Sequence, residues 1–304
     1  MPRPYRWQKK VDQLRNRLRA MFRSDRQGPR PRLCPSCNTL VGTTATRCHE
    51  CGASLTFSLA AASKSFAGIL PGETSATTII FITNILLFGV SLIVTMRGAN
   101  SLNLFGGIDG QVLARLGESQ PLPLLYMQDQ WWRLVTAIFL HGSLIHIAMN
   151  SWVLMDIGPP VEKVYGSARY LFLYVATGAI GFFVSALSGH FSVGASGSIM
   201  GLVGLLLAIT NRRGGAYMAT FRRQLMVWVL SIFIFGLVVR GVDNYAHFGG
   251  LASGFLLGRV FADREPLNAV ERKRAYIFGW IAGIVLVASF AFMLINYFRS
   301  VPTL

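Results

Sequence analysis

After residue 75, the chain consists mainly of long apolar blocks separated by short charged segments. Seven blocks have about 17–25 residues each, enough for a helix to cross about 30 Å of hydrocarbon. The predicted spans are 76–97, 144–162, 168–188, 195–211, 224–241, 245–262 and 275–298. This pattern predicts an all-α polytopic membrane protein in which a six-helix bundle is followed by a seventh, C-terminal transmembrane helix.

The polar residues divide the chain further. The predicted segments are a basic amphipathic segment at 1–32, a cysteine module at 33–55, a linker at 56–75, the six-helix core at 76–262, and a linker with the seventh helix at 263–304. In the first segment, apolar residues at helical spacing are surrounded by Lys and Arg. Such a helix would lie on an anionic inner leaflet, but a solvated charged helix or a loose tail explains the pattern equally well.

Composition and charge support the membrane prediction. Hydrophobic residues make up 52% of the chain and charged residues 14%, whereas soluble domains carry about 25% charged residues. A net charge of +16 would suggest nucleic acid for a soluble protein. Here most Lys and Arg residues flank spans on the side of the N-terminus, which predicts lipid and not nucleic acid as the partner. The positive-inside rule then predicts a plasma (inner) membrane protein with a cytoplasmic N-terminus and an external C-terminus.

The four cysteines form two CxxC pairs ten residues apart, Cys34 with Cys37 and Cys48 with Cys51. Two such knuckles can present four thiolates to Zn²⁺ in a tetrahedron, which predicts a small zinc ribbon. Four protein ligands leave no open position, so the metal is expected to be structural. A redox pair or two disulfides are the alternative, which a reducing cytosol disfavours. A cytosolic protein partner is a further candidate role for this module.

Polar side chains occur inside three predicted spans. His146 and Asn150 are four residues apart and share a helix face, Ser196 opens span four within the Gly194-Ala-Ser196-Gly197 run, and His247 lies near the start of span six. Polar groups at membrane depth are costly and mark function by default. Even-numbered spans run in one direction, so all four side chains are expected at one depth, in the external half.

Small residues indicate how two of these spans pack. Glycines recur every four residues in span four and in span six, at Gly197 and Gly201, and at Gly250, Gly254 and Gly258. Such ridges let two helices approach closely. Because Ser196 and His247 lie one turn outward from the ridges, close approach would bring the hydroxyl to the imidazole.

This combination predicts acyl-transfer chemistry. A serine hydroxyl needs a neighbouring base, and a neutral histidine can act as one. Donors for the oxyanion are available from the free N–H groups at the start of span four, and His146 and Asn150 could add side-chain donors. Asp243 is expected at the surface, so the prediction is a Ser–His dyad and not a triad.

Each residue alone has a plainer explanation. A single intramembrane serine usually packs helices, and a single histidine is more often structural or part of a proton path; only their joint pattern favours catalysis. His141 and His190, in external loops, are interpreted as structural. The Trp131-Trp132-Arg133 run is interpreted as an interface anchor.

Over about 76–262 the chain resembles the rhomboid family of intramembrane serine proteases. The motifs are Trp132-Arg133, His146 with Asn150, Glu162 and Gly166, Gly194-Ala-Ser196-Gly197, and Ala246-His247 followed by Gly250 and Gly254. The resemblance implies a six-helix core whose active site is reached by water from outside, and a chemistry that needs no cofactor. It implies Ser196 as nucleophile, His247 as base, and an oxyanion hole from the Ser196 N–H, His146 and Asn150.

The chain departs from the family at Met200, where some members carry a tyrosine that packs on the catalytic histidine. Packing of His247 is therefore expected from other groups, including Tyr245 or Phe248.

The expected function is an intramembrane serine endopeptidase that cuts transmembrane proteins near their external ends. Two alternatives remain. A transporter or channel would also bury His, Asn and Ser, and a proteolytically inactive rhomboid-like chaperone or adaptor would keep the fold.

Overall fold

The computed structural model describes residues 32–34, 39–42, 45–52, 55, 75–98 and 107–300. The chain divides into two compact units, Met1–Ser58 and Leu59–Leu304. The predicted basic segment up to residue 31, the linker up to residue 74, and Cys37 lie outside the described residues.

The N-terminal unit contains one short antiparallel pair. β1 (Arg32–Leu33) pairs with β2 (Leu40–Val41), with Arg32 opposite Val41 and Leu33 opposite Leu40. Its buried apolar cluster consists of Cys34, Val41, Cys48 and Leu55. The apolar core formed by the described residues of this unit is too small to offset the entropy of ordering the chain, so a further link between the cysteines is expected.

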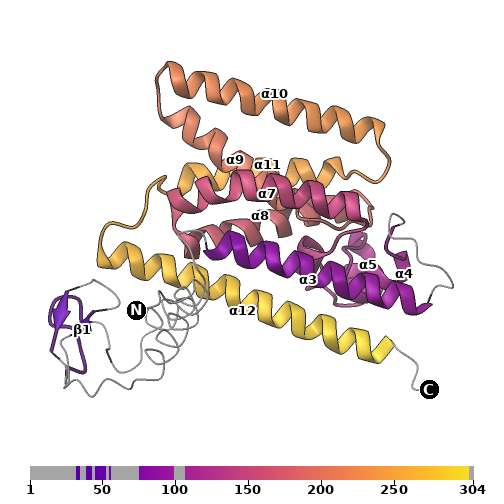
Figure 1. Cartoon of the computed structure of the whole chain (residues 1–304), viewed down its shortest axis with the longest axis horizontal. Coiled ribbons are helices and arrows are strands. Elements are labelled where there is room, and N and C mark those ends of the chain that lie inside the picture. Colours follow the sequence, from indigo (N-terminus) through magenta and orange to yellow (C-terminus); the bar gives the residue numbers. More distant parts are fainter. Residues whose placement is uncertain are drawn as a thin grey trace, which may run out of the picture. The chain divides into compact units, whose positions relative to one another are not determined.

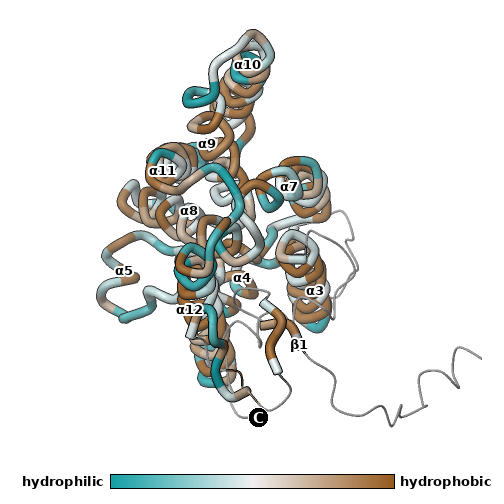
Figure 2. Tube along the Cα trace, turned by 90° about the vertical axis from the view of Figure 1, so that its left-hand side faces the viewer, coloured by the Kyte–Doolittle hydropathy of each residue, from teal (hydrophilic) through white to brown (hydrophobic). Residues whose placement is uncertain are grey.

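The second unit is helical (Figure 1). Its elements are α3 (Ser75–Gly98), α4 (Gly110–Leu116), α5 (Leu122–Met127), α6 (Arg133–Thr136), η1 (Ala137–Phe139), α7 (Leu144–Tyr165), α8 (Ser167–Leu187), α9 (Ser196–Arg212), α10 (Ala216–Val238), α11 (Asn244–Val260) and α12 (Ala269–Ser300). Each predicted span coincides with one long helix, so the predicted all-α bundle with an additional C-terminal helix is confirmed. Seen end-on in Figure 2, hydrophobic residues cover much of these helices, and hydrophilic stretches lie largely at their ends.

Length and composition identify the helices that can cross a membrane. Among the described residues, four helices qualify alone, at Ser75–Arg97, Ser167–Leu187, Ala216–Val238 and Ala269–Arg299. A fifth is obtained if Arg133–Phe139 and Leu144–Tyr165, which meet at 89°, count as one span. The helices α9 and α11 have 17 residues each. Because α9 is largely enclosed by other helices, it needs neither the length nor the uniform apolarity of a lipid-facing span.

Two helices begin earlier than predicted. α10 begins at Ala216 instead of 224, and α12 at Ala269 instead of 275. The added turns carry charged side chains such as Arg222 and Lys273. A charged residue ends an apolar block, but Lys and Arg are good helix formers, so the helix continues into the interface.

The helices α9 and α11 pack through their backbones. A Cβ at Gly250 would lie 2.0 Å from the carbonyl oxygen of Gly197, and one at Gly254 would lie 2.0 Å from that of Gly201. No side chain fits between the helices at these points. The predicted glycine ridges therefore set the distance between the two helices that carry Ser196 and His247.

Glu162, near the end of α7, holds the start of α3. Its carboxylate is 1% exposed and accepts hydrogen bonds from the Ala76 and Thr77 amides, both at 2.9 Å, and from the Thr77 hydroxyl at 2.6 Å. The Ser167 hydroxyl adds a fourth bond at 2.5 Å. The carboxylate thus caps the free N–H groups of a helix start, where its charge also complements the helix dipole.

Candidate functional site

One cavity, of about 480 Å³, is lined by the four polar side chains predicted from the spans. These are Ser196, His247, His146 and Asn150. They come from α9, α11 and α7, and each lies in the first turns of its helix. The structure therefore brings together residues that are up to 101 positions apart in the sequence.

Ser196 is the first residue of α9 and is half-buried at the cavity wall. The loop before it is held by the Gly194 amide, which donates to the Ala137 carbonyl at 2.9 Å. Gly194 has φ +128°, and a Cβ there would lie 2.7 Å from Nε2 of His146. Only glycine fits both the backbone and this close approach, which gives the predicted motif residue a physical reason.

His146 is oriented by its own helix start. Its Nδ1 accepts the Gly142 amide at 3.3 Å, so a neutral ring carries its proton on Nε2. That nitrogen faces Gly194, close to the start of α9. The Asn150 amide nitrogen donates to the His146 carbonyl at 3.0 Å, which leaves one amide proton for the cavity. Both side chains can therefore donate toward the segment that carries Ser196.

His247 lies among buried groups and is 5% exposed. Among the described residues, no hydrogen-bond partner is found for its buried Nδ1. Asp243 is half-buried and not at the surface as expected; one carboxylate oxygen caps α11 and the other accepts the Ser185 hydroxyl at 2.5 Å. In the part of the chain that the structure describes, no hydrogen bond joins Asp243 to the imidazole of His247.

The aromatic neighbour of His247 differs from the expectation. Phe233 of α10 meets the imidazole edge-on, with ring centroids 6.4 Å apart and planes at 89°. Tyr245 stacks on His190 instead, and Phe248 is 59% exposed. The expectation for Tyr245 and Phe248 was wrong because Tyr245 lies two residues before His247 and Phe248 lies directly after it, and residues one or two apart on a helix point in different directions.

Arg133 does not anchor the interface, contrary to the sequence interpretation. It is 4% exposed, and its guanidinium donates to the carbonyls of Ala114 at 2.6 Å and Glu118 at 3.2 Å. A guanidinium offers five donors, which suits a loop whose carbonyls have no helical partner. Arg133 thus organises the loop of residues 107–143 between α3 and α7, which is named the external loop after the side predicted for it from the sequence.

The external loop is joined to the segments on both sides of the cavity. Ser119 and Ser192 exchange two backbone hydrogen bonds, at 3.0 and 3.1 Å. The Ile108 amide donates to the Gly142 carbonyl at 2.7 Å. The loop therefore holds the chain just before Ser196 and just before His146.

Glu118 makes this loop sensitive to pH. Burial raises the pKa of its carboxyl from 4.5 to about 6, although the Arg133 charge opposes the shift. The folded state then holds a proton that the unfolded state releases, so stability should fall as pH rises from about 4.5 to about 6. We expect Glu118→Gln to raise the unfolding free energy at pH 7.5 by about 1 kcal/mol, a figure reduced for solvent screening.

Thermal unfolding in detergent between pH 4 and pH 7.5 measures this effect. Asp129→Asn, an exposed carboxylate of the same loop, controls for the loss of one negative charge. The prediction would be contradicted if the difference in stability between the wild type and Glu118→Gln stayed the same from pH 4 to pH 7.5.

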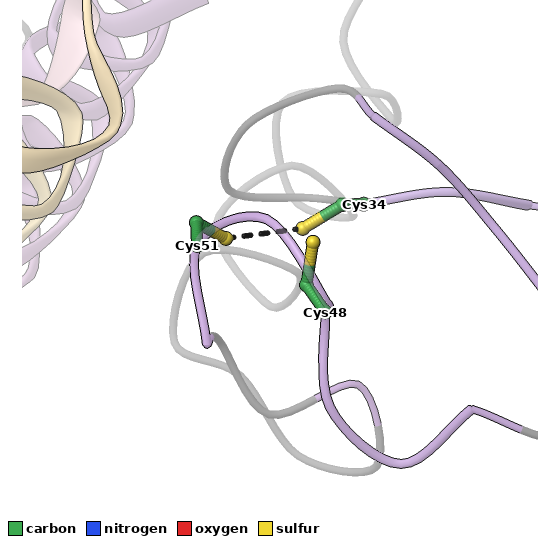
Figure 3. Close-up of side chains that lie close together, drawn as sticks. All are labelled: Cys34, Cys48 and Cys51. Carbon is green, nitrogen blue, oxygen red and sulfur yellow. Dashed lines mark hydrogen bonds between the residues drawn. The ribbon is translucent and has the colours of Figure 1, made fainter.

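The N-terminal unit brings three of the four predicted metal ligands together (Figure 3). The Sγ atoms of Cys34, Cys48 and Cys51 lie within 4.8 Å of one another, and those of Cys34 and Cys51 are 3.7 Å apart. Zn–S bonds of about 2.3 Å in a tetrahedron separate two sulfurs by about 3.8 Å, whereas a disulfide requires about 2.05 Å. The thiol cluster therefore fits a metal ion.

Sequence reasoning missed three residues that shape the cavity. Gly142 orients His146 through its amide, Ser143 caps α7 by accepting the His146 amide at 3.2 Å, and Phe233 contacts His247. A serine just before a helix is a capping signal that could have been used. The contacts made by the Gly142 amide and by Phe233, which comes from another helix, leave no comparable pattern in the sequence.

Comparison with known proteins agrees with this architecture. A family model described as the rhomboid domain matches residues 128–264. Rhomboid protease GluP of Bacillus subtilis is 40% identical over 134 residues, which cover 43% of this chain and 26% of that protein. RHOMBOID-like protein 4 of Arabidopsis thaliana is 34% identical over 188 residues, which cover 57% of this chain and 48% of that protein. The putative rhomboid protease YdcA of Bacillus subtilis is 31% identical over 139 residues, which cover 45% of this chain and 70% of that protein.

The chain thus spans a quarter to a half of the length of GluP and RHOMBOID-like protein 4, but more than two thirds of YdcA. The residues matched by the family model include α7, α9, α10 and α11, the helices that line the cavity. The similarity and the helical membrane architecture point to the same conclusion: the chain belongs to the rhomboid family.

Proposed function

We propose that this protein is an intramembrane serine endopeptidase in which Ser196 is the nucleophile and His247 the general base. One observation carries the proposal: both side chains line a single cavity at the same end of two helices whose backbones touch. A serine and a neutral histidine at one cavity are the minimum needed for acyl transfer. The relatives named rhomboid protease support this choice of reaction.

The reaction follows from these groups. The Ser196 oxygen attacks a peptide carbonyl carbon while His247 accepts the hydroxyl proton. His247 then delivers that proton to the departing amide nitrogen as the C–N bond breaks, which leaves an acyl-serine. Water then attacks the acyl carbon while His247 accepts one of its protons. The bond between that carbon and the Ser196 oxygen breaks, and His247 returns the proton to Ser196, which releases the acid and the free serine. No carboxylate is required, in keeping with the buried Nδ1 of His247, for which no partner is found among the described residues.

The developing oxyanion has three donors in this scheme. The Ser196 amide is free because it belongs to the first turn of α9. The Nε2–H of His146 and the remaining amide proton of Asn150 approach from α7. Fixed donors in a site that largely excludes water stabilise the transition state more than they stabilise the neutral substrate.

The cavity also suggests the substrate. Apart from the site residues, its wall is mainly apolar, with Met149 and Val153 from α7 and Trp228, Ile232 and Phe235 from α10. A transmembrane segment entering between α7 and α10 would find hydrophobic contacts. An intact helix hides its carbonyls in hydrogen bonds, so the segment must unwind locally, which Gly and Pro favour.

The charge distribution supports a position of the cavity on the external side. α9 begins at Ser196 and ends at Arg212, and Arg213 follows; both arginines form ion pairs with Asp263, at 3.3 and 2.7 Å. The arginines therefore mark the opposite end of the bundle from the cavity. By the positive-inside rule that end is cytosolic, with the N-terminus on the same side and the C-terminus outside.

Cleavage in proteoliposomes tests the proposal. The full chain is incorporated with a single-span substrate that carries Gly-Pro near its external end, and mass spectrometry maps the products. We expect one main cut in the external half of the span, and slower cleavage when Gly-Pro is replaced by Leu-Leu. No cleavage, or cleavage confined to soluble loops, would contradict an intramembrane endopeptidase.

We further infer that the cysteine module binds a structural Zn²⁺. The ligands would be Cys34, Cys48 and Cys51, with Cys37 as the fourth expected thiolate. The small buried cluster around these thiols supports a metal-dependent fold. His49 is exposed and is not needed as a ligand.

Metal removal gives a specific prediction. The Cys34→Ser/Cys37→Ser variant should lose the roughly one equivalent of zinc bound per chain, and proteases should cut its N-terminal module faster. Cleavage of the membrane substrate should persist, because no described residue of this unit lines the cavity. Elemental analysis measures the zinc, and His49→Ala is the control that should retain it. A zinc-free wild type with a Cys34–Cys51 disulfide would contradict the inference.

A further inference from the structure

The seventh helix contacts the external loop through a polar side chain. Asn296, near the end of α12, donates from Nδ2 to the Arg115 carbonyl at 3.3 Å and accepts at Oδ1 from Gln130 Nε2, also at 3.3 Å. Its neighbours Leu294 and Ile295 are 52% and 46% exposed, as expected of a surface that faces lipid. An amide on such a helix is costly unless it is hydrogen-bonded, so these contacts are favoured over exposure to lipid.

These hydrogen bonds continue into the centre of the loop. The other end of the Gln130 amide, Oε1, accepts from Nε of Arg133 at 2.5 Å. Arg133 in turn holds the carbonyls of Ala114 and Glu118. A chain of side-chain hydrogen bonds therefore runs from the seventh helix to the guanidinium that organises the loop.

The loop then reaches the two segments that present the candidate catalytic groups. Glu118 is followed directly by Ser119, whose backbone pairs with Ser192, four residues before Ser196. At its other side, Ile108 fixes the Gly142 carbonyl, and the Gly142 amide orients His146. The distance between Ser196 and His146 thus depends on the position of the loop, and that position depends in part on Asn296.

Apolar contacts support the same arrangement. Phe290 of α12 packs on Phe139 of η1, with ring centroids 5.4 Å apart. Tyr297 packs against the apolar cluster of the loop, which includes Ile108 and Leu140. No residue of α12 lines the cavity. The seventh helix can therefore affect the reaction only through other residues.

We propose that Asn296 is a positioning residue, through which the seventh helix holds the external loop in the geometry that Ser196 and His146 require. This inference rests on the proposed protease function. It assigns a task to a helix that lies outside the six-helix core and outside the residues matched by the family model.

The test compares Asn296→Leu, Gln130→Met and the double variant in the proteoliposome assay. We expect each single variant to lower kcat about 10-fold, because small misplacements of reacting groups have large effects on rate. KM should stay unchanged, since the cavity wall is intact. The double variant should be no slower than the slower single variant, because both substitutions break the same connection between α12 and Arg133. Ile295→Ala, a truncation on the lipid-facing side of the same turn, should match the wild type.

Two further measurements separate positioning from general destabilisation. The thermal midpoint of Asn296→Leu should stay within a few degrees of the wild type, and hydrogen exchange at the Ser119 and Ser192 amides should become faster. Unchanged kcat, or losses in the two single variants that multiply in the double variant, would overturn the inference. A wild type that neither cleaves nor reacts with a fluorophosphonate at Ser196 would instead refute the proposed function, while the exchange rates would still report whether Asn296 holds the loop.

Discussion

Ser196→Ala is expected to lower substrate cleavage by about 10⁴-fold or more, and His247→Ala by a similar factor. Removing either member of a serine–histidine pair abolishes covalent catalysis, and only oxyanion stabilisation and binding remain. The two losses should not multiply in the double variant, because both groups serve one step. Initial cleavage rates in proteoliposomes measure the effect, and labelling with a fluorophosphonate reports the nucleophile directly.

A matched control is available for each of the two residues. Ser198, two residues further along α9, is fully buried and does not line the cavity, so Ser198→Ala should retain most of the activity. His190 is exposed and stacks on Tyr245, so His190→Ala should also retain it. Equal cleavage by wild type, Ser196→Ala and His247→Ala would contradict the dyad. Substrate binding without cleavage would favour a chaperone, and solute flux independent of Ser196 would favour a transporter.

Gly250→Ala is expected to destabilise the fold by more than about 3 kcal/mol. The added methyl group would lie 2.0 Å from the Gly197 carbonyl oxygen, which belongs to a helix backbone and cannot rotate away. Relief requires α9 and α11 to separate, which would also move Ser196 from His247. We therefore expect a lower thermal midpoint in detergent and loss of cleavage in whatever fraction remains folded.

Gly283→Ala provides the contrast on α12. A Cβ at Gly283 meets no atom within 4 Å, and alanine favours a helix over glycine by about 1 kcal/mol. This variant should be as stable as the wild type or slightly more so. A Gly250→Ala variant as stable as Gly283→Ala would show that the backbone contact between α9 and α11 is not required.

Much of the architecture could be predicted because the bilayer imposes one rule on every span. Apolar blocks of sufficient length mark the helices, and glycines spaced by four residues mark the pair that approaches most closely. The positions of Ser196, His247, His146 and Asn150 on one side of one cavity follow from that rule and the direction of the chain. The starts of α10 at Ala216 and of α12 at Ala269 could not be predicted from this rule, because charged residues limit insertion into the membrane but do not stop a helix.

The external loop was the least predictable part. Trp132 and Arg133 fit an interface anchor by composition, yet Arg133 is a buried centre of hydrogen bonds to carbonyls. This role depends on the course of an irregular loop backbone, which no repeating pattern of residues in the sequence indicates. For the same reason, Phe233 could not be assigned to His247 in advance, since it comes from a helix whose rotation is fixed only by packing.

The backbone contact between α9 and α11 has a consequence for how this protein could diversify. The two helices that carry the proposed reaction tolerate almost no change in side-chain volume where they touch, so their sequences are constrained by each other. α10, whose window suited to crossing the membrane is only 11% buried, is less constrained, except at Phe233, which contacts His247, and at Gly236, where a Cβ would lie 2.2 Å from Oδ1 of Asn244. It also supplies Trp228, Ile232 and Phe235 to the cavity wall. New substrate preferences can therefore arise by exchanging residues of α10 while the reaction centre stays the same, and grafting α10 from a relative is the natural starting point for redesign.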